Sequence, residues 1–245
     1  MILLYHHVIP SEELPAADER CPLEGLDYNL GPGDFAYQLE WLRRRRFQFV
    51  SLAEYVKQVV EEDRGPGDRV AVTFDDGWRD NHTHALPVLV RLGIPATFFV
   101  VSGQLQGVAA ERRMTAEMLG ELVDAGMTIG AHTRSHPNLA TLSEERLEEE
   151  IGGCKADLES QLGRAVDFLA YPGGRFNEAV LRCAERHGFR AACSVMPAGR
   201  NDRAARYRLS RDVFSPRMDT WRDRLLVRQG GRWLWRLARQ AKGLA

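Results

Sequence analysis

The segment from Val70 to Gly77 reads Val-Ala-Val-Thr-Phe-Asp-Asp-Gly, a β-branched apolar run that ends in two adjacent carboxylates and a glycine. Neighbouring side chains on a strand point to opposite faces, so Asp75 and Asp76 can serve one cavity only if the chain bends there. Gly77 permits such a bend. Carboxylates at the C-terminal end of a buried parallel strand lie where α/β enzymes place their chemistry. The segment therefore predicts an active site in which one carboxylate holds a metal ion and the other handles a proton, with solvated acids at an ordinary strand end as the alternative.

A second strand end carries two histidines. His132 and His136 follow the apolar run Met127–Ala131 and are four residues apart. Two imidazoles at this spacing suit a divalent metal ion that takes nitrogen ligands, and Asp76 can supply an oxygen ligand. A solvated or structural histidine pair is the alternative. Ligand-type residues at two separate strand ends favour the metal site.

Helical and strand patterns alternate along most of the chain, which implies parallel βα units and hence a barrel or an open α/β sheet. The stretch from Pro10 to Pro32 lacks periodicity and predicts a long loop above the first strand. Beyond the two strands named above, strands are expected over residues 96–101, 168–171 and 191–195, and helices over 34–45, 53–62, 85–92, 116–125, 143–162 and 178–187.

Length and composition indicate one ordinary globular domain. The 245 residues are 44% hydrophobic and 27% charged, and the formal net charge of −1 gives no reason to expect nucleic acid as a partner. The N-terminus shows no signal-peptide pattern, and no apolar run reaches the ~20 residues that span a bilayer. The four cysteines form no CxxC pair and suit a reducing compartment. We therefore expect a cytoplasmic location.

Several further motifs resemble, in the same order, those of the polysaccharide deacetylases, the NodB-homology or carbohydrate esterase family 4 proteins. The resemblance runs from Leu3 to about Val213 and starts from the Asp-Asp-Gly and His-Thr-x-x-x-His-Pro segments. It implies an α/β fold, a distorted (β/α)7 barrel, with a catalytic domain over residues 1–215. The other motifs are Tyr5-His6-His7, the Phe35–Leu42 pattern, Gly93–Phe99, Phe168–Gly174 and Leu209-Ser210-Arg211.

The resemblance also implies roles for the residues at the two strand ends. Asp75 corresponds to the general base of the family, and Asp76, His132 and His136 correspond to its metal ligands. The expected cofactor is a divalent metal ion, with Zn²⁺ first and Co²⁺, Ni²⁺ or Fe²⁺ as alternatives.

The turn Tyr171-Pro172-Gly173 is expected to bind substrate. A backbone N–H in this turn, that of Gly173, could stabilise the oxyanion together with the metal ion. Glycine at this position also allows a close approach of the backbone.

The general acid is expected at the N-terminus. Most of the family uses a histidine in a C-terminal Leu-x-His motif, but no histidine follows His187 here. Leu4-Tyr5-His6 has the same pattern. In the poly-N-acetylglucosamine deacetylase branch, which this chain resembles, the barrel is circularly permuted and this strand comes first. Alternation directs His6 inward and His7 outward, so His6 is the expected acid and His7 the alternative.

One family position is altered. Ala170 stands where the usual third motif carries the arginine that holds the catalytic Asp. Arg211 resembles the arginine that the permuted branch uses instead, so we expect it to hold Asp75. Arg175 is a weaker candidate for this role.

These features predict a hydrolase that removes N-acetyl groups from an amino-sugar glycan or glycan precursor. An O-acetyl esterase or a cyclic-amide hydrolase on the same scaffold is the alternative within hydrolases. A catalytically silent carbohydrate-binding protein is the alternative outside them, and the retained Asp and His residues argue against it.

The C-terminal part differs in charge. From Arg211 to Ala245 there are nine Lys or Arg against three Asp, and residues 216–245 form a basic amphipathic extension that includes Trp233. A helix here could pack back on the barrel. Alternatively, it could contact an anionic membrane from the cytoplasmic side, near a lipid-linked precursor.

Overall fold

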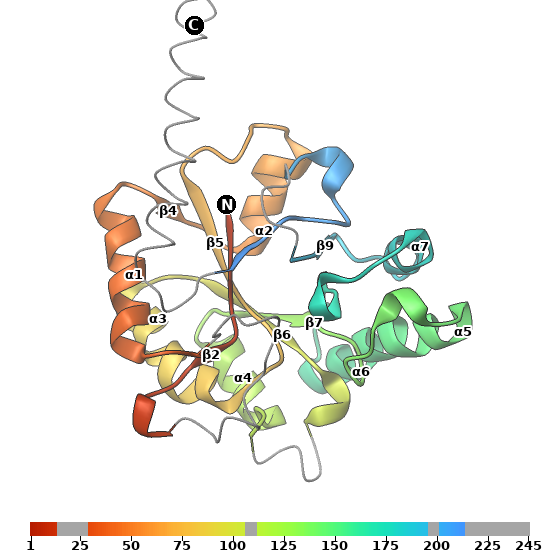
Figure 1. Ribbon diagram of the computed structural model, residues 1–245, viewed down its shortest axis with the longest axis horizontal. Helices are drawn as coiled ribbons and strands as arrows, with labels where there is room; N and C mark the ends of the chain where they lie inside the picture. Colours follow the sequence, from red (N-terminus) through yellow and green to blue (C-terminus); the bar gives the residue numbers. More distant parts are fainter. Residues whose placement is uncertain (14–28, 106–111, 196–200, 214–245) are drawn as a thin grey trace, which may run out of the picture.

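The centre of the molecule is a curled sheet in which every pair of neighbouring strands is parallel (Figure 1). The computed structural model describes residues 1–13, 29–105, 112–195 and 201–213. Along the sheet the strands lie in the order β10 (Asp212–Val213), β1 (Ile2–Tyr5), β5 (Arg69–Phe74), β6 (Ala96–Val100), β7 (Thr128–Ala131), β8 (Phe168–Ala170) and β9 (Ala191–Cys193), and β4 (Gln48–Phe49) pairs with the start of β5.

A short segment near residue 210 connects the two ends of this sheet. Leu209 pairs in parallel with Cys193 of β9, and β10 pairs with β1 through Leu3 and Asp212. The first strand of the chain therefore lies beside the last strand that the structure describes. The predicted α/β barrel class is confirmed.

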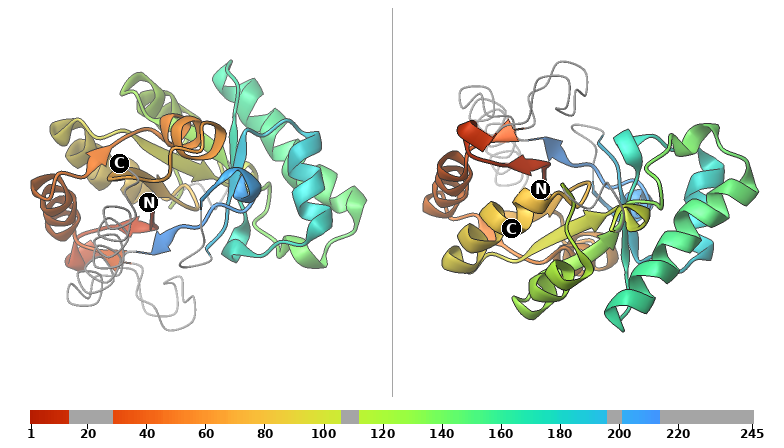
Figure 2. Two further views of the ribbon diagram at one scale, coloured as in Figure 1. Left: turned by 90° about the horizontal axis from the view of Figure 1, so that it is seen from above. Right: turned by 90° about the horizontal axis from the view of Figure 1, so that it is seen from below.

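Helices cover the outside of the sheet (Figures 1 and 2). Side-chain caps start several of them: Ser51, Thr115, Ser143 and Asn177 each accept a hydrogen bond from a backbone N–H of the first turn. The predicted helices are present with boundaries shifted by a few residues. They are α1 (Pro32–Arg44), α2 (Leu52–Tyr55) with η2 (Val56–Glu61), η3 (Asn81–Ala85) with α3 (Leu86–Leu92), α4 (Ala116–Asp124), the run α5 (Glu144–Leu147), η7 (Glu148–Gly152) and α6 (Gly153–Leu162), and α7 (Glu178–Arg186).

The first strand shows how the alternation of side chains builds the barrel. Ile2 packs in an inner cluster with Phe99 and Phe168, whereas Leu3 and Tyr5 pack in an outer cluster under the helices. All are at most 2% exposed. Ile2 thus packs on the opposite side of β1 from Leu3 and Tyr5, as the period of two predicts.

The prediction of an uninterrupted loop from Pro10 to Pro32 is wrong near its C-terminal end. Asn29 and Leu30 form β3, which pairs in parallel with β2 (His7–Val8), because a buried strand edge needs partners for its backbone groups. Residues 14–28 and the basic extension 216–245 lie outside the described residues. Among the helices that the structure describes, none is both long and apolar enough to cross a bilayer.

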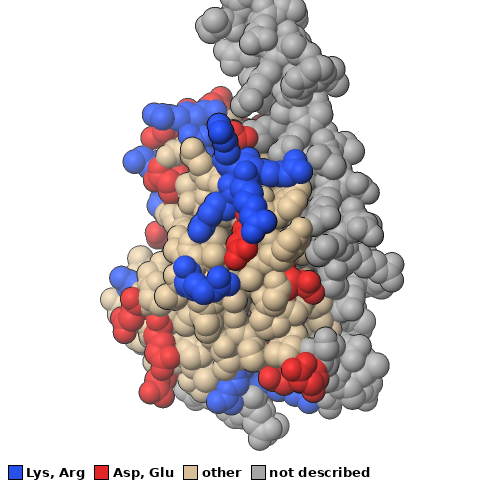
Figure 3. Space-filling model, turned by 90° about the vertical axis from the view of Figure 1, so that its left-hand side faces the viewer, with Lys and Arg blue, Asp and Glu red and all other residues tan. Residues whose placement is uncertain are grey.

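The end of α1 carries a concentration of positive charge. Residues 43–46 are four consecutive arginines, all exposed. Basic side chains gather on the face of the molecule that includes α1 (Figure 3).

Candidate active site

The two carboxylates lie where β5 ends and the chain turns. The N–H of Asp75 donates to the carbonyl oxygen of Tyr5 at 3.0 Å, which continues the pairing of β5 with β1. Asp76 and Gly77 then have φ values of 73° and 67°. The predicted bend is present, but it begins at Asp76, one residue before the glycine. A non-glycine residue in this region costs about 1–3 kcal/mol, and such strain is concentrated at functional sites.

Asp76, His132 and His136 form a group that is able to hold a metal ion. Asp76 Oδ1 lies 3.4 Å from Nε2 of His132 and 3.3 Å from Nε2 of His136. One donor atom from each of the three side chains lies within 4.8 Å of the others. One carboxylate oxygen and two imidazole nitrogens are a donor set that suits zinc and similar divalent ions. The residues therefore fit the expected cofactor.

The loop between the two histidines holds them in position. Thr133 and His136 have φ values of 66° and 63°, and the Thr133 hydroxyl accepts the N–H of His136 at 3.0 Å. Nδ1 of His132 lies 2.8 Å from the carbonyl oxygen of Ala170. Because a carbonyl only accepts, Nδ1 carries the proton, and Nε2 of His132 is left facing Asp76.

Glu150 of η7 also positions this loop. Its carboxylate is 3% exposed and accepts the N–H groups of Arg134 and Ser135 at 3.0 and 2.9 Å and the Ser135 hydroxyl at 2.6 Å. The sequence does not mark this residue as functional. Glu150 ends a run of three glutamates, 148–150, and nothing in the sequence separates the buried one from its neighbours.

Asp75 is paired with Arg211. Two guanidinium nitrogens of Arg211 donate to the two carboxylate oxygens of Asp75, each at 2.6 Å. The guanidinium is fully buried and also donates to the Ser194 carbonyl at 3.0 Å and the Thr73 hydroxyl at 3.3 Å. Arg211 thus lies where the resemblance places it, and Arg175 is exposed on the turn after β8.

Neighbouring side chains lower the pKa values of both Asp75 and Asp76. Burial alone would raise the pKa of Asp75, but the Arg211 guanidinium holds that pKa below its ordinary value. Burial likewise opposes ionisation of Asp76, but the neighbouring His132 and His136 side chains hold its pKa well below the usual range. Both carboxylates are therefore ionised at neutral pH.

The two N-terminal histidines have different surroundings. His6 is 5% exposed, and burial lowers its pKa against the opposing charges of Asp76 and Asp75. His7 instead places Nδ1 at 2.7 Å from Asp80 Oδ2, and its ring packs on Trp78 with 4.3 Å between centroids.

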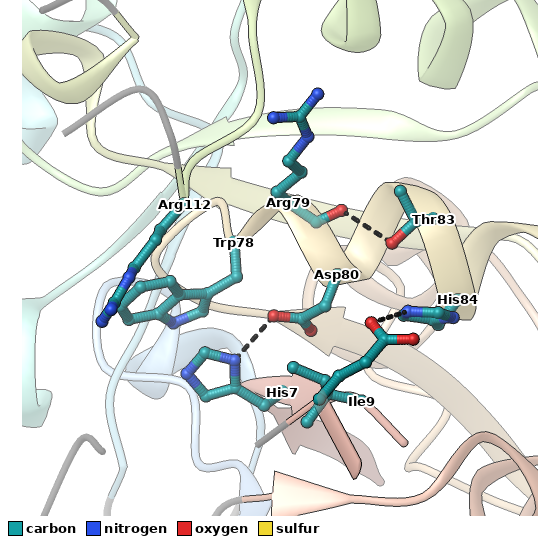
Figure 4. Close-up of a pocket in the computed structure, with 9 residues that line it drawn as sticks. His7, Ile9, Trp78, Arg79, Asp80, Thr83, His84 and Arg112 are labelled. Atoms are coloured by element: carbon teal, nitrogen blue, oxygen red, sulfur yellow. Dashed lines mark hydrogen bonds and ion pairs between the residues drawn. The ribbon is translucent and has the colours of Figure 1, made fainter. Parts of the chain in front are cut away.

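Trp78 connects Asp76 to a neighbouring cavity, and the sequence does not mark it as functional either. Its indole N–H donates to Asp76 Oδ2 at 3.1 Å, which leaves Oδ1 facing the imidazoles. On its other side Trp78 lines a cavity of about 440 Å³ together with His7, Asp80 and His84 (Figure 4). Arg113 stacks on the indole at 3.3 Å and donates to the Asp76 carbonyl at 2.8 Å.

Of the three residues of the turn after β8 that were expected to bind substrate, only Gly173 is exposed. Tyr171 is fully buried, and its hydroxyl donates to the Tyr207 carbonyl at 2.8 Å, so its side chain does not face substrate. Pro172 is also buried. Gly173 is exposed and has a φ of 60°, a conformation that glycine adopts at little cost.

Comparisons with known proteins agree with this geometry. Residues 62–192 match the sequence profile of the family described as polysaccharide deacetylase. YxkH of Bacillus subtilis (strain 168), which is named for the same family, is 27% identical over 218 residues, covering 89% of this chain and 72% of its own. A poly-beta-1,6-N-acetyl-D-glucosamine N-deacetylase of Staphylococcus epidermidis is 23% identical over 211 residues, covering 80% of this chain and 73% of its own.

Two solved structures resemble the chain over nearly their whole length. The Streptococcus pyogenes deacetylase PplD, solved in complex with acetate, has a TM-score of 0.76 and 27% identity, and the match covers 89% of this chain and 92% of PplD. IcaB from Ammonifex degensii has a TM-score of 0.76 and 28% identity, and the match covers 90% of this chain and 93% of IcaB.

Proposed function

The chain belongs to the polysaccharide deacetylase family and is thereby a hydrolase of carbon–nitrogen bonds, and we propose that it removes N-acetyl groups from an amino-sugar glycan in a metal-dependent reaction. One observation carries the proposal: Asp76, His132 and His136 converge beside a second carboxylate, Asp75, that is held by a buried arginine. This arrangement separates a metal-binding carboxylate from a proton-accepting one within a single strand end.

The cofactor that we propose is zinc, held by Asp76, His132 and His136, with Co²⁺, Ni²⁺ or Fe²⁺ as alternatives. A bound divalent ion would lower the pKa of a water molecule and polarise the acetamide carbonyl. Asp76 is oriented for this role by Trp78, and His132 by the Ala170 carbonyl.

Asp75 is the proposed general base. It accepts a proton from the attacking water, and the two hydrogen bonds from Arg211 fix the direction of its oxygens. His132 Nε2 lies 3.9 Å from Asp75 Oδ2, so the base and the proposed metal site are direct neighbours. The exposed Gly173 backbone is the proposed donor to the oxyanion.

His6 is the proposed general acid, which gives a proton to the departing amine. His7 is a weaker choice because Asp80 and Trp78 already hold its ring.

The proposed substrate is a polymer or oligomer of N-acetylated amino sugar. The name of the Staphylococcus epidermidis relative supports this class. The cavity that Trp78 lines offers room, with charged groups for sugar hydroxyls, and Trp78 links this cavity to Asp76 through its indole N–H. Membrane contact through residues 216–245 stays a prediction, because that segment lies outside the described residues. A lipid-linked precursor as substrate and a cytoplasmic location also stay predictions.

Acetate release tests the reaction. We expect the full chain to release acetate from β-1,6-linked N-acetylglucosamine oligomers, to lose this activity with a chelator, and to regain it with Zn²⁺. His136→Gln should lose activity and His82→Gln should keep it, because His82 pairs with Glu121 outside the site. Release only from O-acetylated sugars or cyclic amides would contradict N-deacetylation, and full activity in chelator would contradict metal dependence.

A separate experiment tests the acid. His6→Ala should slow hydrolysis of N-acetyl substrates by about 10²–10⁴-fold, the usual contribution of a general acid, because an amine leaves only when protonated. Activated acetyl esters, whose leaving groups need little protonation, should be slowed much less. Equal losses on both substrates would show that His6 positions substrate or metal and is not the acid.

A further inference from the structure

A second group of ligand-type side chains, separate from Asp76, His132 and His136, joins two helical segments. Cys183 and His187 are four residues apart, at the end of α7, and so face the same side of the helix. Glu148 opens η7, in the helical run that lies beside α7 (Figures 1 and 2). One donor atom from each of the three side chains lies within 4.8 Å of the others.

Hydrogen bonds link the three side chains when no metal ion is bound. Glu148 Oε2 lies 2.5 Å from Nε2 of His187, and Glu148 Oε1 accepts from the Cys183 thiol at 3.7 Å. Arg186 also donates to Oε1. Burial raises the pKa of Cys183 to about 11, with the Glu148 charge adding to it. The thiol is therefore protonated at neutral pH when no metal ion is present.

The backbone makes room for the histidine ring. Gly152 closes η7, four residues after Glu148, and any side chain at this position would overlap the imidazole of His187. Cys183 is fully buried, whereas the side chains of His187 and Glu148 are 30% and 43% exposed. The group thus has a buried sulfur and an open side through which an ion can enter.

We propose that Glu148, Cys183 and His187 bind a transition-metal ion of the zinc type, with water completing the coordination. Thiolate, imidazole and carboxylate are all zinc ligands, and three of them with water make a four-coordinate site. On binding, the Cys183 thiol loses its proton to solvent, and His187 presents an unprotonated Nε2 with its proton on Nδ1. Arg186, half-exposed, either keeps Oε1 or turns to solvent, so Oε2 remains for the metal ion.

Such an ion would fasten α7 to η7, and η7 supports the proposed active site. Glu150, two residues after Glu148, holds the loop of His132 and His136 through three hydrogen bonds. A metal ion at the α7 site would therefore stiffen the helix that positions that loop, without touching substrate.

Cobalt absorption tests the site. The full chain is stripped with a chelator and titrated with Co²⁺, and the thiolate-to-cobalt charge-transfer band is followed. Because Asp76, His132 and His136 contain no sulfur, this band reports only on a cysteine site. We expect the band in the unaltered chain, its loss in Cys183→Ser, and its retention in Cys154→Ala and Cys21→Ser.

A second variant keeps all three ligands. Gly152→Ala should displace the His187 ring and weaken Co²⁺ binding at this site by about 10–100-fold, the usual effect of disturbing ligand orientation. Circular dichroism checks folding, and His187→Gln replaces Cys183→Ser if the latter does not fold. Absence of the band at saturating Co²⁺, or its persistence in both ligand variants, overturns the proposal.

Discussion

Asp75→Asn is expected to lower the turnover of N-acetyl substrates by about 10²–10⁴-fold while the metal content stays unchanged. The amide cannot accept a proton from water, and general base catalysis typically contributes that factor. The metal ligands Asp76, His132 and His136 are untouched. Turnover per folded, metal-loaded molecule and metal content per chain are the measurements.

Folding must be measured in the same variant, because the amide leaves the buried Arg211 guanidinium without its counter-charge. Asp124→Asn, the same chemical change at an exposed position, is the control and should keep full turnover. Near-normal turnover in folded Asp75→Asn would show that the base lies elsewhere and that Asp75 is structural.

Arg211→Met is expected to destabilise the fold by about 3–5 kcal/mol, the usual cost of leaving a buried charge without its partner. Arg211 is fully buried, and it makes two 2.6 Å bonds to Asp75. Denaturant unfolding gives the free energy. Arg175→Met, at an exposed arginine, should change it by less than about 0.5 kcal/mol.

The pH dependence of this variant should change in a defined direction. In the unaltered protein the Arg211 charge lowers the pKa of Asp75, so the stability from this pair is present above the ordinary Asp pKa and is lost as pH falls through the folded pKa. Without Arg211, burial raises the pKa of Asp75. The acidic limb of the rate profile should therefore move to higher pH. An unchanged limb and unchanged stability would show that Arg211 does not control Asp75.

The parts of the site that the sequence could predict are those that lie close together along the chain. Asp75 and Asp76 are adjacent, and His132 and His136 are four apart, so motif and periodicity place each pair at one strand end. Parallel strands then bring the two ends to one edge of the sheet. The Arg211–Asp75 pair, which joins residues 136 positions apart, could be predicted only from the family resemblance.

Other features depend on tertiary contacts that leave no local pattern. Glu150 is buried by the loop that it holds, but in the sequence it is one of three consecutive glutamates. The turns of η2, η3 and η7 have π-helical hydrogen bonding, which hydrophobic periodicity does not distinguish from α-helix. β3 has only two residues and pairs with β2, so its pattern is too short to recognise.

The position of β1 between β5 and β10 has a consequence for biosynthesis. Arg211 is synthesised 136 residues after Asp75, so at ~5–20 residues per second roughly 7–27 s pass before Asp75 can pair with its counter-ion. During this interval one edge of β1 has no neighbour and can pair with another chain. A nascent chain that ends before Arg211 thus has neither a neighbour on this edge of β1 nor an ion pair at Asp75. The same C-terminal segment completes the active site and covers the strand edge at which the chain could aggregate.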